Sequence, residues 1–135
     1  MTMLKVRVAV SEAATRRLVC SLLETQPDVV VLAGAADGGD SPADVLIVDG
    51  APHQPGACAL IESVRRAQPR TRAIVLLAQP TSDAIHAALS AGASGIVARA
   101  QPARELLGAI RVVAQGGSYL CPLSALEPVA IRVEK

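Results

Sequence analysis

The sequence predicts a single α/β domain built on a parallel β-sheet. Short runs of valine, leucine and isoleucine alternate along the chain with segments whose apolar residues recur at helical spacing. The run Val45–Val48 is apolar throughout, which is typical of a strand buried on both faces. Since 135 residues are enough for one compact domain and not two, all the strands are expected to share one sheet.

The predicted elements follow one another in a regular order. Strands are expected at residues 4–10, 29–32, 44–48, 73–77 and 96–98. Helices are expected at residues 12–25, 55–67, from 81 or 82 up to 92, and from 102 to the glycine pair at 116–117. Each helix lies between two strands or follows the last one, as parallel connections require.

Capping residues support these helix boundaries. Ser11 is predicted to cap the first helix, and Thr81 or Ser82 the third. Gly92 suits the end of the third helix, and Pro102 suits the first turn of the last one.

Composition excludes several classes of protein. The net charge is +1 and no charge block stands out, so direct binding to nucleic acid or to a membrane by this segment is not expected. No apolar run could span a bilayer and the N-terminus lacks a signal-peptide layout, so a cytoplasmic location is expected. The three cysteines are scattered, which favours small core residues over disulfides or a metal site.

Asp49 is the first candidate functional residue. It directly follows the apolar run of the third predicted strand, and Gly50 comes next. In open α/β sheets, ligands bind just outside the carboxyl ends of the strands. Asp49 is therefore either a functional carboxylate or the first residue of an Asp-Gly turn.

Three segments near the C-terminus carry a family resemblance. The run 92–99, the run 102–110 and the run 116–120 resemble the second half of a response-regulator receiver domain, closest to the NarL/FixJ subfamily. Residues 24–28, 35–38 and 44–49 match the same pattern in order, so the resemblance covers about residues 4 to 122. It implies a CheY-like, flavodoxin-like five-stranded sheet of order 2-1-3-4-5, with Asp49 as the phospho-accepting residue.

The resemblance also implies a metal site that this chain only partly retains. Receivers hold Mg²⁺ with a pair of acidic residues after the first strand. Here that pair falls on Val10 and Ser11, or on Ser11 and Glu12 if the register moves by one. Magnesium is therefore expected to bind weakly, through Asp49 alone or with Glu12.

The remaining pocket positions are altered too. Where receivers carry a hydroxyl at the end of the fourth strand, this chain has Leu77, which cannot donate a hydrogen bond. The lysine position is Arg99, which could hold a phosphoryl group or pair with Asp49, and the aromatic position is Ile96. Arg99, Ser11 and Glu12 remain as candidate phosphate-pocket residues.

The chain is also too short for the second helix of a receiver. Only five residues separate Gly38 from Asp44, which leaves room for a turn alone. The sheet face beneath the missing helix is expected to expose valine and leucine side chains. A second subunit or the C-terminal tail could cover that face, and we therefore expect a homodimer.

The sequence favours an atypical receiver in bacterial two-component signalling, occupying residues 1–120, with a tail or extra strand at 121–135. It is expected to be phosphorylation-independent or weakly phosphorylated, to contact a histidine kinase or another signalling protein, and to have no enzymatic activity. An alternative is a phosphorylatable receiver from a NarL/FixJ-type transcription regulator without its DNA-binding domain.

A different class stays open on one weak signal. The run His53-Gln54-Pro55-Gly56 is similar to the His-x-x-Gly of cobalamin-binding domains, in which an aspartate precedes the histidine by two positions. Here Asp49 precedes His53 by four positions.

Overall fold

The computed structural model describes residues 3–10, 12–32, 43–50, 55–77, 81–98 and 102–120. The strands in this part of the chain are β1 (Leu4–Ala9), β2 (Val29–Leu32), β3 (Val45–Gly50), β4 (Arg72–Leu77), β5 (Gly95–Ala98) and β6 (Tyr119–Leu120). The helices are α1 (Ala13–Glu24), α2 (Pro55–Ala67), α3 (Ser82–Ala91) and α4 (Pro102–Ala114). None of these helices is long and apolar enough to cross a membrane.

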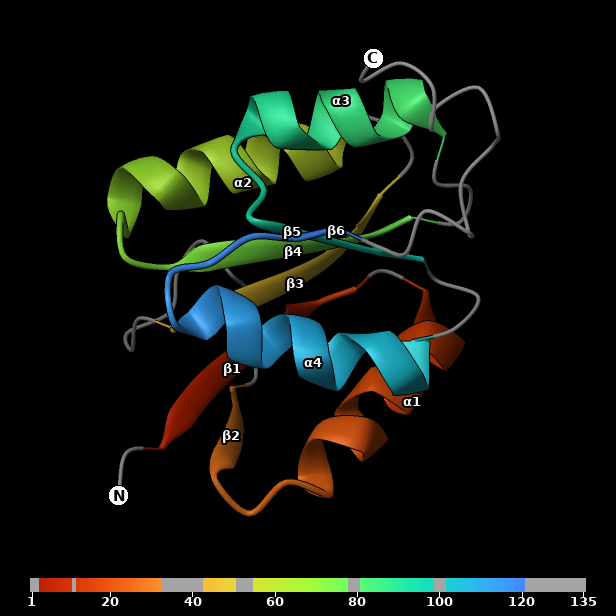
Figure 1. Cartoon of the computed structure of the whole chain (residues 1–135), viewed down its shortest axis with the longest axis vertical. Coiled ribbons are helices and arrows are strands. Elements are labelled where there is room, and N and C mark those ends of the chain that lie inside the picture. The colour runs from red at the N-terminus through yellow and green to blue at the C-terminus, as the bar shows by residue number, and fades with distance from the viewer. Residues whose placement is uncertain are drawn as a thin grey trace.

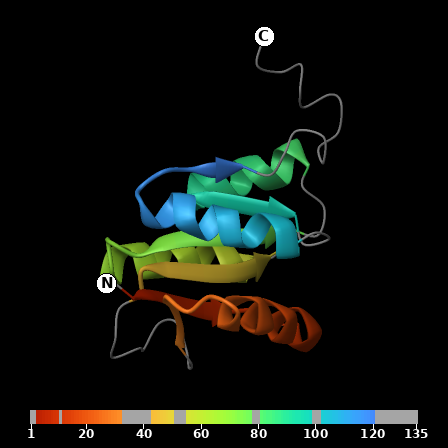
Figure 2. The ribbon, with the colours of Figure 1, turned by 60° about the horizontal axis from the view of Figure 1, so that its bottom comes forward.

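All six strands pair in parallel, in the order β2-β1-β3-β4-β5-β6, and Figure 2 shows this order across the sheet. The predicted α/β class and the order 2-1-3-4-5 are confirmed. The predicted number of five strands is wrong by one, because Tyr119 and Leu120 add a strand beside β5. The backbone N–H of Tyr119 donates to the Ser94 carbonyl at 3.0 Å. Two residues are too few to produce an alternating pattern in the sequence.

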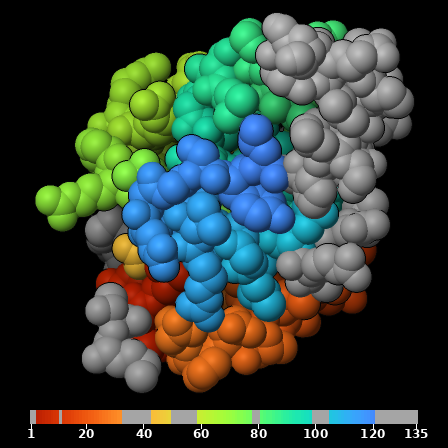
Figure 3. All heavy atoms as spheres, in the orientation of Figure 1, coloured from red at the N-terminus to blue at the C-terminus, as the bar shows by residue number. Residues whose placement is uncertain are grey.

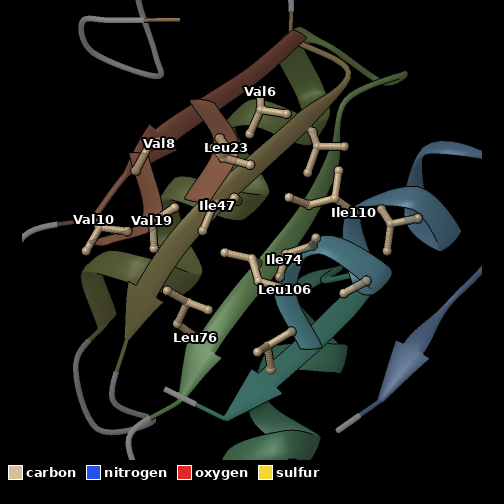
Figure 4. Close-up of a cluster of buried hydrophobic side chains, with 14 residues drawn as sticks. Val6, Val8, Val10, Val19, Leu23, Ile47, Ile74, Leu76, Leu106 and Ile110 are labelled. Atoms are coloured by element: carbon tan, nitrogen blue, oxygen red, sulfur yellow. The ribbon is translucent and has the colours of Figure 1, made fainter. Parts of the chain in front are cut away.

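The helices cover the sheet in two layers, with α1 and α4 on one face and α2 and α3 on the other (Figure 1). Figure 4 shows the core beneath α1 and α4, where side chains from both helices pack onto the inner strands. This core contains Val6, Val8, Val10, Val19, Leu23, Val45, Ile47, Ile74, Leu76, Val97, Leu106, Ala109, Ile110 and Val113. The opposite core lies beneath α2 and α3 and includes many alanines, which let these two helices approach the sheet closely.

Most predicted helix boundaries agree with the structure. The Thr81 side chain accepts a hydrogen bond from the Ala84 N–H at 3.2 Å, and Gly92 ends α3 in the left-handed region with φ = 113°. The prediction that Ser11 caps the first helix is wrong, because Glu12 occupies the N-cap position of α1. The Glu12 carboxylate accepts the Thr15 hydroxyl instead of capping the backbone.

The sheet face expected to lie beneath a missing helix is only partly apolar. By strand alternation, Val30 and Leu32 point away from the α1 side, and Val30 is 36% exposed. On the same face β1 presents Lys5 and Arg7, and Arg7 is buried with 3% exposure. Residues 33–42, on which the prediction of a missing helix rests, and the tail 121–135 lie outside the described residues.

Candidate functional site

The carboxyl edge of the sheet brings several candidate positions together (right side of Figure 1). The strand register pairs Ala9 of β1 with Val48 of β3, so Val10 comes alongside Asp49 one residue further on. Across β3 and β4, Gly50 pairs with Leu77. Val10, Asp49 and Leu77, three positions expected in a phosphoryl pocket, therefore lie at the ends of three adjacent strands.

Asp49 is half-buried and belongs to the face covered by α1 and α4. Val45 and Ile47 of the same strand pack into the core on that face, and Asp49 continues the alternation with period two. Leu46 and Val48 point to the opposite core beneath α2 and α3. The Asp49 carboxylate thus leaves the strand on the side from which α1 approaches.

The end of β1 does not supply the acidic pair that a receiver needs for magnesium. Val10 is 2% exposed and is part of the apolar core, so it contributes no ligand. The Arg16 guanidinium of α1 donates to the Val10 carbonyl at 2.9 Å, which puts a fixed positive charge at this strand end. The Glu12 carboxylate accepts a hydrogen bond from the Thr15 hydroxyl of the same helix end.

These groups do not fit a hard divalent cation. Magnesium prefers several oxygen ligands in a near-octahedral arrangement. In the part of the chain that the structure describes, no group of three or more His, Cys, Asp or Glu side chains is placed to hold a metal ion. The Arg16 guanidinium at the Val10 carbonyl would also repel a metal ion there.

Two further pocket positions are buried apolar side chains. Leu77 is 2% exposed and Ile96 is completely buried, and both pack in the core beneath α2 and α3. Neither side chain has a hydrogen-bonding group, so this side of the pocket has no donor for a phosphoryl oxygen at these positions.

The other candidates lie outside the described residues. They are Ser11, Arg99 and the His53-Gln54 segment of the cobalamin-like motif. Asp49 and Glu12 are described, but no observation tests their roles, so Asp49 as phosphoacceptor and Arg99, Ser11 and Glu12 as phosphate-pocket residues stay predictions. The prediction missed Arg16, although its position in the second turn of the first predicted helix could have indicated a reach back to the end of the first strand.

A two-pronged ion pair lies at the amino-terminal ends of the strands, opposite the carboxyl edge. Arg111 of α4 donates from its two terminal nitrogens to the Asp28 carboxylate at 2.5 and 3.0 Å, and to the Gln26 side-chain oxygen at 2.9 Å. These hydrogen bonds from Arg111 hold the pKa of Asp28 below its ordinary value of 3.8. The pair ties the turn before β2 to the last turn of α4.

Comparison with known proteins gives the family context. The chain is 30% identical over 126 residues to the oxygen regulatory protein NreC of Staphylococcus haemolyticus, a match that covers 87% of this chain and 58% of that protein. The chain thus spans less than two thirds of the length of this relative. No protein-family model matches it.

Solved structures agree with this match. A two-component response regulator of the LuxR family from Aurantimonas sp. SI85-9A1 superposes with a TM-score of 0.80 and 23% identity, covering 98% of this chain and 99% of that one. The isolated receiver domain of RcsB from Salmonella enterica serovar Typhimurium gives a TM-score of 0.78 at 23% identity, with the same coverage. The predicted resemblance to response-regulator receiver domains, closest to the NarL/FixJ subfamily, is confirmed.

Proposed function

We propose that this receiver domain signals through protein–protein contacts whose strength does not depend on phosphorylation of Asp49. The observation that carries the proposal is the chemistry of the carboxyl edge. A buried valine stands where a metal ligand is needed, and a buried leucine stands where a hydroxyl donor is needed. Phosphoryl transfer relies on positioning and on charge neutralisation. The valine removes a ligand for the neutralising metal, and the leucine removes a hydrogen bond that positions the phosphoryl group.

The loss at Leu77 can be given a magnitude. A hydrogen bond to a charged group contributes about 1.5–3 kcal/mol. Losing one such contact lowers an equilibrium constant by about one to two powers of ten. The loss of an acidic ligand at Val10 would weaken phosphorylation further, because the phosphoryl oxygens would have less divalent counter-charge.

The proposed partners are a histidine kinase or another protein of bacterial two-component signalling, in the cytoplasm, with the domain itself as a homodimer. Exposed apolar side chains offer contact points for a second subunit on both sides of the sheet: Leu18 on α1 and Val112 on α4, Leu89 on α3, and Leu120 on β6. The domain would act as a binding module and not as an enzyme.

A second candidate is a phosphorylatable receiver in a NarL/FixJ-type transcription regulator. It is favoured by the retained Asp49 at the carboxyl edge and by the length of the relative, of which this chain matches 58%. The fixed Arg16 guanidinium at the neighbouring strand end could then neutralise part of the phosphoryl charge in place of a metal.

The intact mass of the protein after incubation with acetyl phosphate and Mg²⁺ distinguishes the two candidates. We expect no adduct on the native chain, and an adduct on the Val10→Asp, Leu77→Thr variant, which restores a ligand and a hydroxyl. Circular dichroism of the variant checks that it is folded, and light scattering of the same samples reports whether the native domain is a dimer.

Asp49→Asn is the control for the site of modification. An adduct on the native chain that disappears in Asp49→Asn would contradict phosphorylation-independent signalling and favour the second candidate. No adduct on the folded, restored variant would contradict the assignment of Val10 and Leu77 as the missing pocket positions.

A further inference from the structure

An arginine-rich surface lies at the edge of the sheet opposite Asp49. Residues 65–72 contain four arginines, Arg65, Arg66, Arg70 and Arg72, and no acidic residue occurs between positions 63 and 82. We call these four residues the arginine cluster. The net charge of +1 for the whole chain conceals this local excess.

Three elements bring the cluster to one place on the left side of Figure 1, where α2 ends and β4 begins. Arg65 and Arg66 lie in the last turn of α2, Arg70 lies in the turn after it, and Arg72 begins β4. All four side chains are exposed. In Figure 3 the yellow-green atoms of this part of the chain project from the left margin of the molecule.

Two of the arginines lie close to glycines in neighbouring turns. The Arg65 side chain lies against the backbone of Gly92, because a Cβ built on that glycine would come within 2.3 Å of the Arg65 Cδ. A Cβ built on Gly116 would lie 3.8 Å from a terminal nitrogen of Arg72. The cluster therefore extends from the end of α3 to the turn after α4.

A hollow of about 380 Å³ opens beside the cluster, between the ends of α2 and α3. Glu62, Arg65, Arg66, Ser90 and Ala91 line it. Among the described residues, no carboxylate forms an ion pair with any of the four guanidinium groups, and Glu62 pairs with none of them. Within the part of the chain that the structure describes, the four arginines are therefore open to carboxylates from another molecule.

The helix dipole accounts for only half of the cluster. Cations in the last turn of a helix are favoured by its negative end, which explains Arg65 and Arg66. Arg70 and Arg72 lie beyond the helix and gain nothing comparable from it. Their exposed charge, which no described carboxylate pairs, raises the self-repulsion of the cluster, and a bound anion would relieve it.

We infer that the arginine cluster is a docking surface for an acidic segment of a partner protein. Guanidinium groups bind carboxylates through paired hydrogen bonds, and this fold already uses such a pair between Arg111 and Asp28. A nucleic acid is the weaker fit, because its backbone needs an extended cationic track. Here the exposed carboxylate of Glu62 lies in the same hollow as Arg65 and Arg66 and interrupts the basic surface.

Fluorescence anisotropy with a labelled hexaglutamate peptide at low salt tests this inference. We expect the native chain to bind the peptide and the Arg66→Gln, Arg70→Gln variant to bind about tenfold more weakly, since two charge-assisted contacts are lost. Arg17→Gln, on the exposed side of α1, removes one charge away from the cluster and should change the affinity by less than about twofold.

Three results would overturn the inference. The first is that the native chain shows no measurable binding to the peptide. The second is that Arg17→Gln loses as much affinity as Arg66→Gln, Arg70→Gln. The third is that a short DNA duplex binds at the cluster more tightly than the peptide. Both arginines of the double variant are exposed, so its melting temperature should stay that of the native chain. The single variants Arg66→Gln and Arg70→Gln repeat the measurement if the double variant is misfolded.

Discussion

Asp28 joins the turn after α1 to helix α4 through its ion pair with Arg111. Both side chains remain partly exposed, at 30% and 41%, so the charges are screened by solvent. The two-pronged geometry still lowers the pKa of Asp28 below 3.8, and the shift comes mainly from the hydrogen bonds donated by Arg111. A carboxyl whose pKa is lower in the folded chain stabilises the fold only while it is ionised.

Asp28→Asn should therefore destabilise the protein in a pH-dependent way. Above the ordinary pKa of 3.8 the native chain has the full contribution of the ion pair, and the variant should melt at a lower temperature. As the pH falls through the lowered pKa of the folded state, the native chain loses this contribution and the two melting curves should converge. Melting temperatures at about pH 7 and about pH 3 measure the difference. Glu24→Gln, an exposed change on α1, is the control, and a difference that is constant with pH would contradict the ion-pair account.

Single residues of the candidate site were predictable to different degrees. Asp49, Val10 and Leu77 could be placed from the sequence, because the end of a parallel strand can be read from its apolar run. The bond from Arg16 to the Val10 carbonyl could not, since it depends on how a long side chain on α1 folds back over the sheet edge. Sequence spacing gives the turn of the helix on which such a residue lies but not its rotamer.

At the scale of elements, glycines have opposite roles in α3 and α4. Gly92 ends α3 with φ = 113°, a conformation that residues with a Cβ rarely adopt, and the Arg65 side chain occupies the space where a Cβ would lie. Gly108 is exposed in the interior of α4, and a Cβ there would meet no atom within 4 Å.

Alanine at these two positions should change stability in opposite directions. Gly92→Ala should lower the free energy of unfolding by about 1–2 kcal/mol, because the left-handed conformation becomes strained. Gly108→Ala should raise it by about 0.5–1 kcal/mol, since alanine loses less backbone entropy in a helix. Urea unfolding of both variants beside the native chain measures the two effects, and a stabilised Gly92→Ala would contradict the assigned role of Gly92 as a C-cap.

Long elements were predictable, and short ones were not. Helices α2 and α4 begin at the residues predicted for them, because proline and apolar spacing mark them together. Strand β6 has two residues, and its pairing depends on a turn after α4 in which Gly116 adopts φ = 95°. The extra strand expected from the sequence lies in the tail at 121–135, outside the described residues, so β6 was not predicted.

At the scale of the whole molecule, the sheet separates two surfaces of different chemistry. At the carboxyl ends of the strands, Asp49 lies beside the apolar side chains of Val10 and Leu77. At the amino-terminal ends lies the arginine cluster. Strand β4 runs from one edge to the other over the six residues Arg72–Leu77. At about 3.3 Å per residue this distance is roughly 17–20 Å, or about two Debye lengths at 0.1 M ionic strength.

Charge changes at one edge should therefore have little electrostatic effect at the other. We expect Asp49→Asn to leave the affinity for hexaglutamate within about twofold of the native value at 0.1 M salt, since the interaction is screened over this distance. Conversely, Arg66→Gln, Arg70→Gln should not alter the response of Asp49 to acetyl phosphate. Anisotropy and intact mass measure the two effects on the same protein samples. A change larger than tenfold in peptide affinity on Asp49→Asn would need a conformational coupling of about 1.4 kcal/mol through the strands, and would make the arginine cluster an output surface of the Asp49 site.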